Sequence, residues 1–147
     1  MTKLNIGAGY KRIDGFINID CVQTGVTDVI LDIEKDKLPY EDNSVDEIAC
    51  YETLEHLEDI IWIMNEMHRV LKPECVLHGK VPGTWKGAIA DPTHKRIFVK
   101  ESFDYFAGIN PNHPSQPSRP RNADYGIKPW NKILVDEGIR FKLTPRK

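Results

Sequence analysis

The sequence predicts an α/β domain with a mainly parallel β-sheet. Three observations support this prediction: short β-branched runs recur between turn residues in the first half of the chain, one amphipathic helix follows them, and a further β-type run comes directly after that helix. Strands that alternate with helical segments are typical of parallel sheets. A length of 147 residues suits one domain, residues 1–147.

Four strands are expected before the helix. Each is a short apolar run that ends at a glycine, an acidic residue or a turn, as buried strands do. They span Leu4–Ile6, Phe16–Ile19, Asp28–Leu31 and Val45–Tyr51.

The predicted helix spans Glu58–Leu71, where apolar residues recur at steps of three and four and form one stripe. Arg69 and Lys72 suit the negative carboxyl end of this helix, and Pro73 ends it. A fifth strand is then expected over Val76–Val81, closed by a Pro-Gly turn.

The chain changes character after Gly83. A polar segment, Thr84–Lys100, precedes a short helix near Glu101–Phe106. Four prolines in Asn110–Pro120 exclude a regular helix or a central strand, so an exposed loop is expected there. Lys132–Val135 and Ile139–Leu143 are predicted to form a closing antiparallel hairpin.

Composition excludes several classes of protein. The 20 Lys and Arg against 22 Asp and Glu give a net charge of −2, which does not favour a dedicated nucleic-acid binder. No apolar run is long enough to span a bilayer, and no targeting peptide is expected before the first strand. Cys21, Cys50 and Cys75 are odd in number and widely spaced, which favours a reducing compartment, so a cytoplasmic protein is expected.

A glycine turn and two aspartates follow successive strands. Gly7-Ala8-Gly9 ends the first strand, Asp20 ends the second and Asp32 follows the third. Ligands bind beyond the carboxyl ends of parallel strands, where a glycine turn allows close backbone approach. Carboxylates at the neighbouring strand ends can bind ribose hydroxyls and an adenine amino group, so these three places predict an adenosine pocket.

Several motifs resemble class I S-adenosylmethionine-dependent methyltransferases, in particular the compact type 11 group. They are Leu4–Gly9, Gly15–Asp20, Leu38–Asp46, Leu54–His56, Glu66–Pro73 and, later in the chain, Asp91–Arg96. The resemblance runs in family order from Lys3 to about Gly83. It implies a Rossmann-like methyltransferase fold, with residues 1–83 as the cofactor-binding half and residues 84–147 as the acceptor side.

The resemblance also implies site residues for S-adenosylmethionine. Gly7-Ala8-Gly9 would lie beneath the methionine and ribose, Asp20 would bind the ribose, and Asp32 with the Ile33 backbone would face the adenine. The residues after the fourth strand that would border cofactor and acceptor are Tyr51, Glu52 and Leu54.

A hydroxyl or amine acceptor would need a base, for which His94 and Asp91 are the candidates, followed by His56 and Tyr51. The five histidines lack ligand spacing, so no metal is expected. The sequence does not identify the methyl acceptor.

The link from Gly9 to Phe16 is too short for the crossover helix of the family, so that helix is expected to be missing or shortened. A helix of six residues, Tyr10–Gly15, spans only about 9 Å, whereas the same residues extended reach about 20 Å. Without that helix, Ile6, Ile17 and Ile19 are expected to be poorly covered. Because exposed apolar patches mark interfaces, a homodimer or a partner protein at this sheet face is predicted.

The sequence departs from the family pattern at Asn5, at Tyr10-Lys11 and at Pro73-Glu74-Cys75, where an acidic residue, a third glycine and a Pro-Gly-Gly turn are usual. These departures leave open a non-catalytic domain that binds the cofactor or a protein partner. A nicotinamide-dependent oxidoreductase is a further alternative, disfavoured because the full Gly-x-Gly-x-x-Gly pattern is absent.

Overall fold

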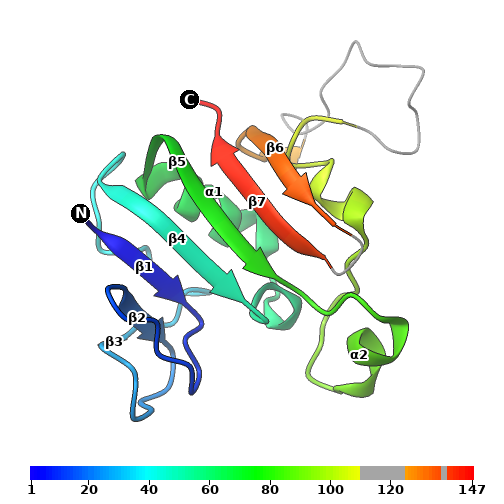
Figure 1. Ribbon diagram of the computed structural model, residues 1–147, viewed down its shortest axis with the longest axis horizontal. Coiled ribbons are helices and arrows are strands. Elements are labelled where there is room, and N and C mark those ends of the chain that lie inside the picture. The colour runs from blue at the N-terminus through cyan, green and yellow to red at the C-terminus, as the bar shows by residue number, and fades with distance from the viewer. Residues whose placement is uncertain (110–124, 137–138) are drawn as a thin grey trace.

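A computed structural model describes residues 1–109, 125–136 and 139–147 of the chain. Seven strands form one sheet in the order β3-β2-β1-β4-β5-β7-β6 (Figure 1). Their bounds are β1 Lys3–Ile6, β2 Ile17–Asp20, β3 Val29–Ile30, β4 Val45–Tyr51, β5 Leu71–Lys80, β6 Trp130–Val135 and β7 Arg140–Pro145. The predicted Asn110–Pro120 loop and part of the hairpin turn lie outside the described residues.

The first five strands are parallel to one another, and β7 and β6 add an antiparallel pair at one edge. This arrangement confirms the predicted mainly parallel α/β sheet with a C-terminal hairpin. Parallel pairing also brings the carboxyl ends of β1, β2, β3 and β4 to one edge of the sheet, where ligands bind in open α/β folds.

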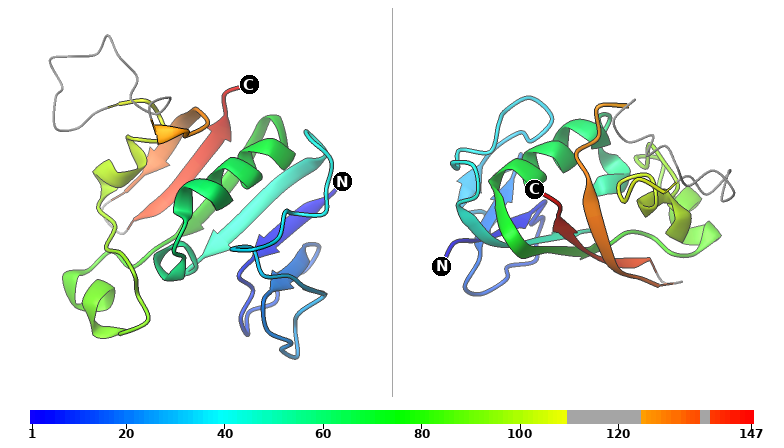
Figure 2. Two further views of the ribbon diagram at one scale, coloured as in Figure 1. Left: turned by 180° about the vertical axis from the view of Figure 1, so that it is seen from behind. Right: turned by 90° about the horizontal axis from the view of Figure 1, so that it is seen from above.

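The long helix α1, Ile60–Val70, packs on one face of the sheet (Figure 2). It begins at Asp59, whose side chain accepts a hydrogen bond from the Trp62 N–H at 2.9 Å, a typical N-cap contact. Its apolar stripe, including Met64 and Met67, lies in the core against the sheet. The chain enters β5 directly after the helix, five residues before the predicted strand.

The predicted poor cover of Ile6 and Ile19 is wrong, because both side chains are fully buried, and Ile17 is partly buried against the core. Side chains alternate between the two faces of a strand, and these isoleucines lie on the face that α1 covers. The opposite face carries no helix in the described part of the chain (Figure 2). The homodimer stays a prediction, but poor cover of these isoleucines no longer supports it.

The face opposite α1 is polar instead. The Lys3 ammonium lies 2.6 Å from Glu47, and the other Glu47 oxygen lies 3.1 Å from His78 Nε2. His78 Nδ1 in turn contacts the Tyr51 hydroxyl at 2.9 Å. These side chains can face water, so the sheet needs a helix layer on only one side.

The link between β1 and β2 contains no helix, as predicted. A side-chain network holds it instead: the Asn5 amide donates to Asn18 Oδ1 at 2.9 Å and to the Lys11 carbonyl at 3.1 Å. Asn18 in turn donates to Asp28 at 2.8 Å. Asn5 and Asn18 are both buried, so these polar groups are satisfied in the way that buried amides require.

The segment between β3 and β4 also lacks a helix, and Arg69 of α1 fixes it. The Arg69 guanidinium donates to the carbonyls of Leu38 and Tyr40 at 3.0 and 2.9 Å. It also lies 2.9 Å from the buried Glu66 carboxylate and 2.8 Å from Asp42. One side chain therefore joins the helix to a loop whose Leu38 belongs to the core.

Glu74, in the position where the family usually has glycine, adopts a left-handed backbone with φ of 62°. This conformation costs a residue with a Cβ about 1 kcal/mol. We expect Glu74→Gly to raise the free energy of unfolding by about 0.5 kcal/mol, measured by urea denaturation. Glu74→Ala keeps the Cβ and should not stabilise the protein; equal effects of the two substitutions would contradict the argument.

Beyond β5 the structure contains a helix that the sequence analysis did not predict, α2, Trp85–Ala90. Two short 3-10 helices, η1 (Leu54–His56) and η2 (Lys100–Phe103), complete the described elements, and η2 begins the predicted Glu101–Phe106 helix. Among the described residues, no helix combines the length and apolar character needed to cross a membrane.

Candidate functional site

The carboxyl ends of β1, β2 and β4 and the residues after β3 surround one cavity of about 300 Å³, the strand-end pocket. Its lining residues are Gly7, Gly9, Ile19, Asp20, Cys21, Leu31, Asp32, Ile33, Glu34, Glu52, Thr53, His56 and Leu57. The glycine turn and both predicted aspartates therefore border a single cavity. Apolar side chains with a few polar groups are typical of small-molecule sites.

The turn after β1 is fixed by its backbone. The N–H groups of Gly7 and Ala8 both donate to the Ile19 carbonyl at 3.0 Å. Gly7 has φ of 70°, and a Cβ placed there would lie 2.1 Å from Thr53 Oγ1. Only glycine fits this position, because Thr53 after β4 packs directly against the turn.

Asp20 and Asp32 occupy different surroundings in the pocket. Asp20 accepts hydrogen bonds from the N–H groups of Gly9 at 2.7 Å and Val22 at 3.0 Å. Asp32 accepts from the Glu34 N–H at 3.1 Å, and the Lys35 ammonium, 2.5 Å away, lowers the pKa of Asp32. Each carboxylate oxygen has more than one lone pair, so both groups are held in place and can still accept from a ligand.

Three of the predicted cofactor residues do not line the strand-end pocket. Ala8 and Tyr51 line a neighbouring cavity of about 840 Å³, the sheet-face pocket, together with Tyr10 and Lys11. Leu54 is fully buried in the core. The structure adds residues that the sequence analysis did not name as cofactor-binding, including Cys21 and Thr53.

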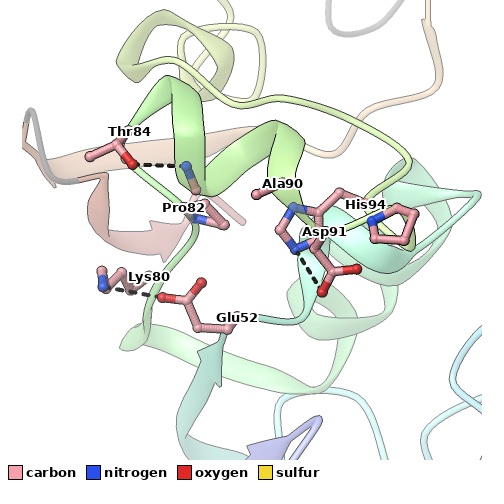
Figure 3. A pocket seen from close by; sticks show the side chains of 10 residues that line it. Glu52, Lys80, Pro82, Thr84, Ala90, Asp91 and His94 are labelled. Carbon is pink, nitrogen blue, oxygen red and sulfur yellow. Dashed lines mark hydrogen bonds and ion pairs between the residues drawn. The ribbon is translucent and has the colours of Figure 1, made fainter.

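A third cavity of about 910 Å³, the α2 pocket, lies between the end of β5 and helix α2. Figure 3 shows Glu52 and Lys80 beside Pro82 and Thr84, with Asp91 and His94 at the other side. Two of the predicted catalytic residues, Asp91 and His94, therefore lie in this pocket, while His56 lies in the strand-end pocket.

Glu52 lines all three pockets. It has a left-handed backbone with φ of 49°, its N–H donates to the Lys80 carbonyl at 2.7 Å, and its carboxylate lies 3.2 Å from the Lys80 ammonium. Strained backbone of this kind clusters at functional sites. Glu52 marks the place where the three cavities meet.

Two histidines from distant segments lie ring to ring at the border between the strand-end and α2 pockets. The ring centroids of His56 and His94 are 4.7 Å apart. His94 Nδ1 lies 2.9 Å from the Ala88 carbonyl, and His56 Nδ1 lies 3.0 Å from the Thr93 hydroxyl. That hydroxyl lies 2.7 Å from Asp91, so the segment after α2 positions both rings.

Glu55, next to His56 in the chain, is only 1% exposed. Neither of its carboxylate oxygens has a hydrogen-bond partner among the described residues. Burial raises the pKa of Glu55 to about 7, and the charge of nearby Glu52 adds to the shift. One ligand atom from each of Glu55, His56 and His94 lies within 4.8 Å of the others. No metal is expected from the sequence, because the spacing of these three residues along the chain does not indicate that they lie together.

Comparison with known proteins agrees with the geometry. Residues 16–78 match a family model described as "Methyltransferase domain". No curated protein sequence matches the chain. The matched segment holds Asp20 and Asp32 and ends within β5.

Solved structures with the same fold include three described as S-adenosylmethionine-dependent methyltransferases. The one from Archaeoglobus fulgidus has 18% identity and a TM-score of 0.59, covering 71% of this chain and 57% of its own. The one from Aquifex aeolicus has 18% identity and a TM-score of 0.57, covering 99% and 81%. A putative one from Methanococcus maripaludis has 16% identity and a TM-score of 0.54, covering 99% and 78%.

Several matched structures are longer than this protein. The chain spans 57% of the Archaeoglobus protein and 44% and 38% of two further matched chains. Residues 16–78 are therefore similar to the methyltransferase-domain family, and the chain shares the fold of solved structures described as S-adenosylmethionine-dependent methyltransferases.

Proposed function

We propose that the protein binds S-adenosylmethionine in the strand-end pocket and transfers its methyl group to an acceptor in the α2 pocket. The observation that supports this most directly is that the glycine turn, Asp20 and Asp32 border one cavity. The family match and the fold of the neighbours favour the same cofactor.

The residues present fit the cofactor. The Asp20 carboxylate is held by two backbone N–H groups and keeps free lone pairs for ribose hydroxyls. Asp32 can accept from an adenine amino group. Apolar walls for the purine ring come from Ile19, Leu31, Ile33 and Leu57.

The chemistry needs little from the protein beyond position. When bound, S-adenosylmethionine supplies an electrophilic methyl group for in-line displacement. The chain's own part is to hold donor and acceptor in line and to exclude water. Glu52 lies at the junction where donor and acceptor would meet, and His94, Asp91 and His56 are the candidates to accept a proton from a hydroxyl or amine acceptor.

Calorimetry with S-adenosylmethionine and S-adenosylhomocysteine tests the proposal. Both should bind at one site, and Asp20→Asn should weaken binding about tenfold, because a carboxylate that accepts ribose hydroxyls is lost. Asp14→Asn, at a fully exposed side chain outside the pocket, is the matched control. Absence of binding at millimolar nucleoside would overturn the proposal, and binding without methylation of any acceptor offered would favour the non-catalytic alternative.

Cys21 provides a second measurement, which locates the bound nucleoside without any substitution. Cys21 lines the strand-end pocket and is an exposed residue. Partial burial of its thiol and the charge of Asp20 raise the pKa of Cys21. Alkylation is therefore done at alkaline pH. Saturating S-adenosylhomocysteine should slow alkylation of Cys21 about tenfold and leave the partly exposed Cys75 unchanged. If Cys21 is alkylated at the same rate with and without the nucleoside, the nucleoside binds elsewhere.

A further inference from the structure

We propose that Glu55, His56 and His94 bind a divalent transition-metal cation at the wall between the strand-end pocket and the α2 pocket. One ligand atom from each residue lies within 4.8 Å of the other two. Metal–ligand distances of about 2.0–2.2 Å place the ligand atoms of a tetrahedral site about 3.4 Å apart, so each member of a pair must move by about 0.7 Å. Side-chain movements of less than about 1 Å would therefore bring the three ligand atoms to bonding distance.

The hydrogen bonds around the two histidines leave the same nitrogen available on each ring. A carbonyl oxygen can only accept, so His94 Nδ1 donates to Ala88. The Thr93 hydroxyl donates to the Asp91 carboxylate, so its oxygen accepts from His56 Nδ1. Nε2 then carries the lone pair on both rings, and the Asp91 carboxylate lies 3.8 Å from the Nε2 of His94, beyond hydrogen-bond distance. A backbone carbonyl on the other nitrogen, as at His94, is a usual support of a metal-binding histidine.

Glu55 supplies the negative charge. Its buried carboxylate has no hydrogen-bond donor among the described residues, and an unpartnered buried carboxylate is costly. The two cations that follow His94 in the chain act elsewhere: Lys95 lies 2.9 Å from Glu58, and the Arg96 guanidinium donates to the Leu57 and Glu58 carbonyls at 2.7 and 2.6 Å. A bound cation would remove the penalty on Glu55.

The donor set restricts the kind of metal. Two imidazoles and one carboxylate suit Zn²⁺, Fe²⁺, Co²⁺ or Mn²⁺, whereas Ca²⁺ and Mg²⁺ prefer an all-oxygen shell. Three protein ligands leave coordination positions open, as in catalytic rather than structural sites. His56 lines the strand-end pocket and His94 lines the α2 pocket (Figure 3), so a metal held by both rings lies beside the path between the two pockets.

Metal binding excludes a second role for the same atoms. A ring nitrogen whose lone pair is bound to a metal cannot accept a proton from a methyl acceptor. The metal site and the role of His56 or His94 as a base are therefore alternatives, and a measurement of metal binding decides between them.

The test is titration of the metal-free full chain with Co²⁺, followed by absorption spectroscopy, and with Zn²⁺, followed by calorimetry. We expect about one equivalent to bind, with visible absorption bands for Co²⁺. Glu55→Gln, His56→Asn and His94→Asn should each weaken binding about 100-fold. The matched control is His78→Asn, because His78 already contacts Tyr51 and Glu47 through its two ring nitrogens.

Folding of the variants is followed in the same experiment. Saturating Zn²⁺ should raise the melting temperature of the natural chain and of His78→Asn, and leave that of Glu55→Gln unchanged, since a ligand stabilises only a protein that binds it. Binding that is absent, or unchanged in all three ligand variants, would overturn the metal site. The nucleoside calorimetry is done without metal, so failure of the metal site leaves the proposed methyl transfer untouched.

Discussion

Gly7→Ala is expected to lower the free energy of unfolding by about 3 kcal/mol or more. Two costs add at this position. The backbone has φ of 70°, which disfavours any residue with a Cβ, and that Cβ would lie 2.1 Å from Thr53 Oγ1 and 2.9 Å from its Cβ. Thr53 is itself buried and fixed by a 2.9 Å hydrogen bond from its hydroxyl to the Tyr51 carbonyl. Urea denaturation followed by circular dichroism measures the effect.

Gly15→Ala separates the two costs. Gly15 has φ of 80° but nothing lies within 4 Å of a Cβ placed there, so only the conformational cost of about 1 kcal/mol is expected. Thr53→Ala in the Gly7→Ala background should recover part of the loss, because two of the three closest atoms disappear. If Gly7→Ala and Gly15→Ala cost the same, the packing of Thr53 against the turn does not determine the glycine.

Arg69→Met is expected to lower the free energy of unfolding by about 3 kcal/mol. The substitution keeps the apolar stem and removes the guanidinium. Within the described part of the chain, this leaves the buried Glu66 carboxylate with only the 3.3 Å hydrogen bond from the Leu38 N–H. The Tyr40 carbonyl loses its Arg69 donor as well, and the Leu38 carbonyl loses one of two donors and keeps the Tyr40 N–H at 2.8 Å. The ion pairs with Glu66 and Asp42 raise the pKa of Arg69 further above its already high value, so the group is charged at any pH used to measure stability.

A double-mutant cycle identifies the buried charge as the cause. Glu66→Gln combined with Arg69→Met should be at least about 1 kcal/mol more stable than Arg69→Met alone, since no unpaired charge then remains. Asp42→Asn, at the exposed end of the same cluster, should change stability by less than about 0.5 kcal/mol. Additive effects at positions 66 and 69 would show that Glu66 does not depend on Arg69.

The places of the strands along the chain could be predicted from the sequence because short apolar runs and turn residues are local signals. The error concerned the faces of the sheet. Lys3-Leu4-Asn5-Ile6 alternates polar and apolar side chains, which is typical of a strand with one face in water. That alternation, followed through β1 and β2, would have placed Ile6 and Ile19 in the core and predicted the polar face.

The residues around the strand-end pocket could be predicted where a strand end fixes their place: the glycine turn, Asp20 and Asp32. The grouping of Glu55 and His56 with His94 could not, since it depends on how the segment after α2 returns to the end of β4. Helix α2 itself is only six residues long and contains Gly87, so it carries a weak helical signal. Its Thr84 cap, whose hydroxyl accepts from the Gly87 N–H at 3.0 Å, was the local sign of its start.

The polar face opposite α1 shows that the strand-end pocket can form with a helix layer on one side of the sheet only. The positions of the turn and of the two aspartates depend on which strands are neighbours and where they stop, and neither property involves a second layer of helices. A domain with this sheet can therefore lack one of two helix layers and keep the geometry at the strand ends. Such a domain buries less apolar area, so the missing layer lowers the stability of the scaffold and leaves the arrangement of the strand ends unchanged.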